Sequence, residues 1–191
     1  MSKIDPDKPL PQIHKTEVVA TSKLFRIEQM DLEFSNGATR QFERMAGSGR
    51  GAVMIVPFLD DETLLLVREY AAGTHSYQLG FPKGLIDPGE EPPEAANREL
   101  MEEVGYGANQ LSHLHSVSMA PTFFNATMHI LIAKDLYPKR LEGDEPEPLE
   151  VVPWSIKDSK ALLDRADFTE ARSIVALLMA EKWIQEKNAT R

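Results

Sequence analysis

Alternation of polar and apolar residues is clearest near the start of the chain. Two alternating runs, at residues 24–34 and 38–45, flank an Asn36-Gly37 pair, which is typical of the turn of a β-hairpin. Because two strands alone are only marginally stable in water, we expect this hairpin to pack on another surface.

Longer apolar runs beyond the hairpin predict the core of a larger domain. The runs at 52–59 and 63–70 are typical of buried strands in a mixed sheet. Further strands are predicted at residues 116–121, 128–137 and 151–154. Strands interrupted by two or three helices favour an α/β/α sandwich with a mixed central sheet.

Two helices follow from helical spacing of apolar residues. A helix of about twelve residues is predicted between Pro92 and Gly105, because proline suits a first helical turn and glycine follows a helix end. Its apolar face consists of Ala96, Leu100 and Val104. The C-terminal run 169–187 predicts a second helix that packs on the core.

A glycine-rich segment at 47–51 marks a plausible boundary between parts of the chain. We therefore expect residues 1–15 to form a mobile tail, 16–48 a small antiparallel β appendage, and 49–191 the main domain.

Composition narrows the class of protein. The 191 residues are 42% apolar, which is enough for a buried core. Acidic residues outnumber basic ones by 30 to 21, and the net charge of -9 disfavours binding to nucleic acids or anionic membranes. The absence of cysteine excludes disulfides and thiolate metal sites. With no apolar run long enough for a membrane span and no signal peptide, we expect a cytoplasmic protein.

The stretch GLIDPGEEPPEAANRELMEEVGY, residues 84–106, carries the candidate chemistry. On an α-helix Glu99, Glu102 and Glu103 share one face, where like charges repel unless a cation lies between them. A hard divalent cation prefers such oxygen ligands. The alternative is an exposed acidic helix with ordinary i,i+4 ion pairs, such as the one that Arg98 can make with Glu102.

The spacing of charged residues and glycines in this stretch resembles the box of the Nudix hydrolases, with Tyr106 where that family usually has an aliphatic residue. The resemblance implies a hydrolase, dependent on Mg²⁺ or Mn²⁺, that acts on nucleoside diphosphates linked to another group. It implies metal ligands at Glu99, Glu102 and Glu103, and a backbone carbonyl at Lys83 or Gly84. It also implies supporting roles in the box for Gly84, Glu90, Arg98 and Gly105.

Segments outside the box extend the resemblance to bacterial members of the ADP-ribose pyrophosphatase branch. They include LEFSNG, VREY, QLGFPKGLIDPGE and LEGDEPEPL. Such enzymes cleave ADP-ribose, diadenosine triphosphate and NADH and release AMP, and they form homodimers through the N-terminal appendage. Gln78 departs from the glutamate expected at its position. The alternatives are a Nudix pyrophosphatase for a nucleoside triphosphate or nucleotide sugar, and a non-catalytic ADP-ribose sensor.

Other candidate residues each have a structural alternative. Arg68 could bind a diphosphate, or pair with Glu69 or another acid. Phe123 could stack on adenine, or pack in the core. The resemblance implies that a glutamate of the acidic loop 142–150 takes the proton from the attacking water or binds a further metal, and Glu147 and Glu145 are the candidates; a run of this composition is otherwise a solvated loop.

Overall fold

The computed structural model describes residues 8–47 and 49–189, which form two compact units. The first comprises the described residues up to Gly49 together with Ser118–Ala126, and the second comprises Arg50–Val117 and the described residues from Thr127 onward. Residues 1–7 of the expected tail lie outside the described part. Within the described ranges, no helix combines the length and the apolar character that crossing a membrane requires.

The first unit contains a three-stranded antiparallel sheet in the order β1-β2-β3. Strands β2 (Arg26–Glu33) and β3 (Thr39–Met45) are the predicted hairpin, and Gly37 in its turn has a φ of 79°. Strand β1 (Gln12–Thr21) is a third strand, and it begins inside the segment expected to be a tail. Its pairing with β2 has two register irregularities, which interrupt the regular alternation by which a strand is recognised in a sequence.

The second unit contains two sheets. One has four strands in the order β7-β4-β9-β8, and β4 is parallel to β9 but antiparallel to β7, so this sheet is mixed. The other has the order β10-β5-β6 with antiparallel pairing. The strands are β4 (Ala52–Pro57), β5 (Thr63–Ala71), β6 (Ser76–Gly80), β7 (Lys83–Leu85), β8 (Tyr106–Ser118), β9 (Thr127–Pro138) and β10 (Glu150–Ser155).

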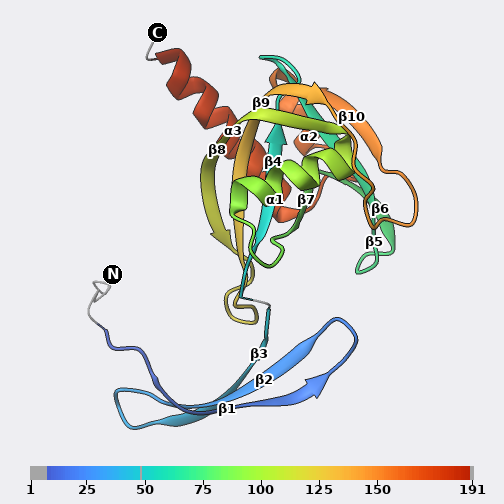
Figure 1. Cartoon of the computed structure of the whole chain (residues 1–191). Coiled ribbons are helices and arrows are strands. Elements are labelled where there is room, and N and C mark those ends of the chain that lie inside the picture. The colour runs from blue at the N-terminus through green and yellow to red at the C-terminus, as the bar shows by residue number, and fades with distance from the viewer. Residues whose placement is uncertain (1–7, 48, 190–191) are drawn as a thin grey trace. The chain divides into compact units, whose positions relative to one another are not determined.

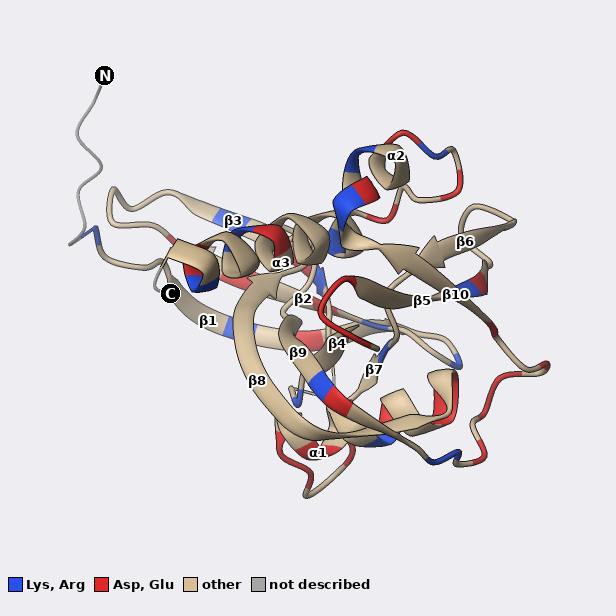
Figure 2. Ribbon diagram, turned by 90° about the horizontal axis from the view of Figure 1, so that it is seen from above, with Lys and Arg blue, Asp and Glu red and all other residues tan. Residues whose placement is uncertain are grey.

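Helices lie on both faces of the mixed sheet. They are α1 (Pro92–Glu99), the π-helical turn η1 (Leu100–Val104), the 3-10 turn η2 (Ile156–Asp158), α2 (Ser159–Leu163) and α3 (Ala171–Ala189). Helix α1 covers one face of β4 and β9, and α3 covers the other (Figures 1 and 2). The expected α/β/α arrangement with a mixed central sheet is confirmed.

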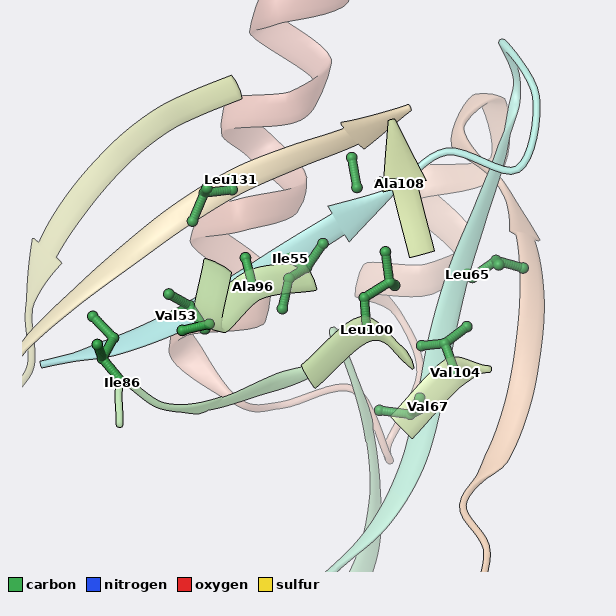
Figure 3. Close-up of a cluster of buried hydrophobic side chains, with 12 residues drawn as sticks. Val53, Ile55, Leu65, Val67, Ile86, Ala96, Leu100, Val104, Ala108 and Leu131 are labelled. Atoms are coloured by element: carbon green, nitrogen blue, oxygen red, sulfur yellow. The ribbon is translucent and has the colours of Figure 1, made fainter. Parts of the chain in front are cut away.

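The core beneath α1 fixes the position of the acidic stretch. Val53 and Ile55 of β4 and Leu131 of β9 pack in one buried cluster with Ala96 and Leu100 (Figure 3). The predicted apolar face of the helix is confirmed, because Ala96, Leu100 and Val104 are at most 3% exposed.

One sequence prediction needs correction, and two further strands were missed. The strand predicted at 116–121 is instead the end of β8, which begins at Tyr106 and stops at Ser118. Residues beyond it bend away, and the backbone N–H of Met45 donates to the carbonyl of Phe123 within the first unit. The short strands β6 and β7 were not predicted, because neither is long enough to establish a period of two.

Candidate metal and substrate site

The loop before α1 is held at its start by the backbone pairing of β7, and closer to the helix by hydrogen bonds from its own side chains. Strand β7 pairs with β4, so Gly84 lies opposite Val53. The chain then turns through Gly89, whose φ of 91° favours glycine. The Glu90 carboxylate accepts a hydrogen bond of 3.0 Å from the Asp87 N–H. The loop therefore folds back against the start of the helix.

Arg98 fastens this loop to the helix. Its guanidinium donates two hydrogen bonds, of 2.8 and 2.9 Å, to the carboxylate of Glu90, and a third of 2.9 Å to the carbonyl of Leu85. Hydrogen bonding with Glu90 raises the pKa of Arg98, and the same bonds lower the pKa of Glu90. These bonds stabilise the charged forms of both side chains, which agrees with the supporting roles in the box that the resemblance implies for Glu90 and Arg98.

The carboxylates of Glu99 and Glu103 are buried at 8% and 4% exposure. Burial raises the pKa of Glu99, and it raises the pKa of Glu103 to about 8. The π-helical turn η1 carries Glu102 and Glu103, and Gly105 ends it with a φ of 82°. Glu103 accepts a hydrogen bond of 3.2 Å from the Lys83 N–H, so it links the helix to β7.

The donor set fits a hard divalent cation. Every side-chain donor on this face is a carboxylate, and two of them are buried where the charged form is costly without a nearby cation. A Cβ atom on Gly84 would overlap the Glu99 carboxylate, so only glycine lets the β7 backbone approach that ligand. The residues therefore provide both carboxylate and backbone oxygens.

Arg98 also holds these carboxylates in the present arrangement. One of its nitrogens donates to Glu99 at 2.7 Å and to Glu102 at 3.1 Å. Across residues 8–47 and 49–189, no three side chains of His, Asp or Glu are already grouped as closely as metal ligands. A bound cation would compete with the Arg98 guanidinium for the carboxylates of Glu99 and Glu102.

A pocket of about 540 Å³, here called the box pocket, lies over this face. Its basic side chains are Lys83 and Arg98. Its acidic side chains are Glu69, Asp87, Glu99, Glu102, Glu103, Glu142, Asp144 and Glu145. Figure 2 shows this acidity on α1 and on the loop that leads to β10. At the carboxylate face, a pocket this acidic would hold a polyanionic ligand only together with cations.

The two glutamates predicted in the acidic loop lie in different places. Glu145 lines the box pocket, and the adjacent Gly143 comes so close to the helix that a Cβ on it would be 3.6 Å from the Cβ of Glu102. Glu147 instead accepts a hydrogen bond of 2.6 Å from the hydroxyl of Tyr77, in a neighbouring cleft.

The structure does not bring Arg68 to the carboxylate face. Its guanidinium binds Glu150 at 2.8 Å and Asp167 at 2.5 Å, and the bonds to Asp167 and Glu150 raise the pKa of Arg68. The sequence alternative of an ion pair therefore describes its present contacts, although the partners are not Glu69. Successive residues of a strand point to opposite faces, which separates Arg68 from Glu69.

Phe123 belongs to the first unit and is 61% exposed, so it is not part of a core. Gln78 accepts a hydrogen bond of 2.9 Å from Thr169 and donates one of 2.8 Å to Ser76.

Sequence reasoning missed the side chains of Glu69 and Lys83, which form an ion pair at the edge of the box pocket. The alternation of β5 was the available signal, because it places Glu69 opposite to Arg68. The lysine directly before Gly84 would then have completed the pair.

Family models match two parts of this chain. Residues 11–44 match the NudE-type Nudix hydrolase N-terminal domain, and residues 49–177 match the NUDIX domain.

Individual relatives extend over most of the chain. ADP compounds hydrolase NudE of Escherichia coli (strain K12) is 57% identical over 175 residues, which cover 92% of this chain and 94% of that protein. ADP-ribose pyrophosphatase of Bacillus subtilis (strain 168) is 27% identical over 91% of each chain. A crystal structure of an ADP compounds hydrolase superposes with a TM-score of 0.90 at 54% identity, over 96% of this chain and 98% of that one.

Proposed function

Because this chain belongs to the Nudix hydrolase family, we propose that it hydrolyses the diphosphate of ADP-linked compounds and releases AMP. The substrates proposed are ADP-ribose, diadenosine triphosphate and NADH. The observation that carries the proposal is the buried acidic face of Glu99 and Glu103 beneath the box pocket, in a chain 57% identical to an ADP compounds hydrolase.

Nudix hydrolases require divalent cations, and we propose Mg²⁺, or Mn²⁺ in its place. Glu99, Glu102 and Glu103 would hold the cation, together with a backbone carbonyl at Lys83 or Gly84. When bound, the cation neutralises phosphate charge and lowers the pKa of a water molecule. The raised pKa of Glu99 and of Glu103 supports this assignment, since a cation would stabilise their charged forms.

The side chains of the box then position the reaction. Arg98 keeps the loop on the helix through Glu90, and Gly105 ends the π-helical turn that carries the buried Glu103. Most of the catalysis in such a site comes from orientation and charge rather than covalent chemistry.

Either Glu145 or Glu147 would take the proton from the attacking water. Glu145 can act from its present position in the box pocket, whereas Glu147 can act only if the loop moves and the Tyr77 bond breaks. Comparing Glu145→Gln with Glu147→Gln distinguishes them, because only loss of the proton acceptor should lower kcat by about a hundredfold or more.

The first unit supports a homodimer. Exposed apolar side chains of the two outer strands lie on one face of its sheet, namely Ile13 and Val18 of β1 and Phe42 of β3. We propose that a second copy covers this sheet. The cytoplasmic location remains a prediction from the sequence.

The central test is incubation with Mg²⁺ and either ADP-ribose or NADH, followed by chromatography for AMP. Both reactions should yield AMP, and Glu103→Gln should lower kcat by at least about a hundredfold because it removes a charged ligand. Absence of AMP from both reactions would contradict the proposal. Comparing kcat/KM for nucleotide sugars and nucleoside triphosphates tests the alternative substrates.

A further inference from the structure

The ion pair between Lys83 and Glu69 lies where two pockets meet. Both residues line the box pocket, and both also line a second pocket of about 330 Å³, here called the side pocket. A ligand that extends from the carboxylate face into the side pocket must therefore pass this ion pair.

The side pocket has the lining of a site for a small polar group. Its lining includes the apolar residues Val67 and Leu79 and the polar residues Gln78, Glu170 and Arg172. Beside the hydrogen bonds that they already make, the carboxylate of Glu170 and the amide of Gln78 have further acceptor and donor positions for the hydroxyls of a sugar. Its volume is near the lower end for ligand pockets, which suits a pentose better than a whole nucleoside.

The other charges around the side pocket are already engaged. The carboxylate of Glu170 accepts hydrogen bonds from the backbone N–H groups of Arg172 and Ser173, at 3.1 and 2.9 Å, and from the Arg172 side chain at 2.6 Å. Glu170 thus accepts hydrogen bonds from backbone N–H groups at the start of α3, and the Arg172 side chain balances its charge. The start of that helix is therefore not the anion site.

Lys83 differs from Arg98, the other basic residue of the box pocket. Arg98 bonds to Glu90, Glu99 and Glu102 at once, so removing it would uncouple the loop. The ammonium of Lys83 has one carboxylate partner among its described ion pairs, and that partner, Glu69, is 41% exposed. A phosphate at the junction of the pockets can replace this partly solvated carboxylate.

We propose that the side pocket binds the ribosyl group of the substrate's non-adenylate half, and that the Lys83 ammonium binds the phosphate attached to it. Glu69 holds the ammonium in place until that phosphate arrives. This inference rests on the proposed function for its choice of substrate, but it makes a claim about binding that hydrolysis does not test.

The test is calorimetric titration of the full chain, without divalent cations, with ribose 5-phosphate, inorganic phosphate or ribose. Ribose 5-phosphate should bind at least about tenfold more tightly than either fragment, because it engages both the ammonium and the pocket. Lys83→Met should weaken its binding about tenfold or more, and Lys83→Arg should restore most of the affinity. Lys157→Met is the matched control, since Lys157 is ion-paired with Glu62 and lines neither pocket.

Glu69→Gln provides a readout that a purely structural ion pair would not give. Removing the competing carboxylate should tighten binding of ribose 5-phosphate, whereas loss of a structural contact should weaken it or leave it unchanged. Wild-type protein that fails to bind ribose 5-phosphate overturns the inference, as does equal binding by Lys83→Met, or binding by Glu69→Gln that is no tighter than wild type.

The outcome is separate from that of the AMP assay. Binding with the expected pattern in a protein that releases no AMP would support the side pocket and refute the proposed reaction. Release of AMP without that binding pattern would support the proposed reaction and refute the role of the side pocket.

Discussion

Gly84 shows how one absent side chain shapes the candidate site. Its backbone needs no unusual φ, yet a Cβ there would overlap the carboxylate of Glu99. The resemblance to the Nudix box placed this glycine in the site. Only the structure shows why a glycine is needed there, which is the close approach of β7 to the helix.

Gly84→Ala should therefore push Glu99 from its position. We expect the free energy of unfolding to fall by about 1–3 kcal/mol from overpacking, and more Mg²⁺ to be needed for half-maximal activity. Thermal unfolding and a Mg²⁺ titration measure the two effects. Gly73→Ala is the control, because a Cβ on Gly73 would have no atom within 4 Å. Equal Mg²⁺ dependence in both variants would refute the role of Gly84.

Asp167 carries a second prediction, which concerns stability against pH. Two bonds of 2.8 Å from Arg165, with a further bond from Arg68, lower the pKa of Asp167 well below its usual range. A carboxylate whose pKa is lower in the folded state stabilises the fold above the unfolded pKa of about 3.9. This stability is lost as the pH falls below that value toward the folded pKa.

Asp167→Asn should thus lower the free energy of unfolding by about 1–3 kcal/mol at pH 7, and the difference from wild type should shrink below about pH 4. Urea unfolding across this pH range provides the measurement. Asp164→Asn is the matched control, since the side chain of Asp164 is exposed and makes no ion pair within the described residues. A deficit that stays constant down to pH 2 would contradict the argument.

At the scale of elements, the sequence predicted the helix from Pro92 to Gly105 and its buried face, because proline, glycine and apolar spacing are local signals. It did not predict the change to a π-helical turn at Leu100, which alters the geometry expected for Glu102 and Glu103. The difference arises because hydrogen bonding by the Gly105 N–H to Leu100 depends on packing, not on the identity of one residue.

The contacts of the acidic loop could not be predicted from the sequence either. Loop 142–149 has no periodic pattern, and its placement depends on strands far away in the sequence. For the same reason the sequence left open whether Arg68 binds phosphate or an acidic side chain, because its partners Glu150 and Asp167 lie 82 and 99 residues away.

The bond between Tyr77 and Glu147 predicts where the loop is fastened. Tyr77 is 52% exposed, so Tyr77→Phe should change overall stability little while it releases Glu147. Hydrogen exchange of a peptide covering 141–150 should become faster. In Tyr70→Phe, which loses a bond to His75 instead, exchange of that peptide should match wild type. Unchanged exchange in Tyr77→Phe would show that the loop is held elsewhere.

At the scale of the whole molecule, the first unit presents a sheet with a largely apolar face. Cross-strand partners share a face, and Ile13, Leu32, Met30, Phe42 and Val18 lie on the same face as the ion pair of Glu28 and Arg44. An isolated three-stranded sheet with this composition exposes apolar side chains that a partner would bury, which is the physical basis for the proposed homodimer.

Phe42→Glu tests that basis, because it replaces an apolar side chain of this face, 41% exposed, with a charged one. Light scattering after size exclusion should give about twice the chain mass of 21.4 kDa for wild type and a mass near that of one chain for the variant. Gln41→Ala, one residue along β3 on the opposite face, should remain dimeric. A monomeric wild-type protein would refute the proposed homodimer. A dimeric Phe42→Glu protein would place the interface on another surface, because a charge buried in the proposed interface should weaken the dimer.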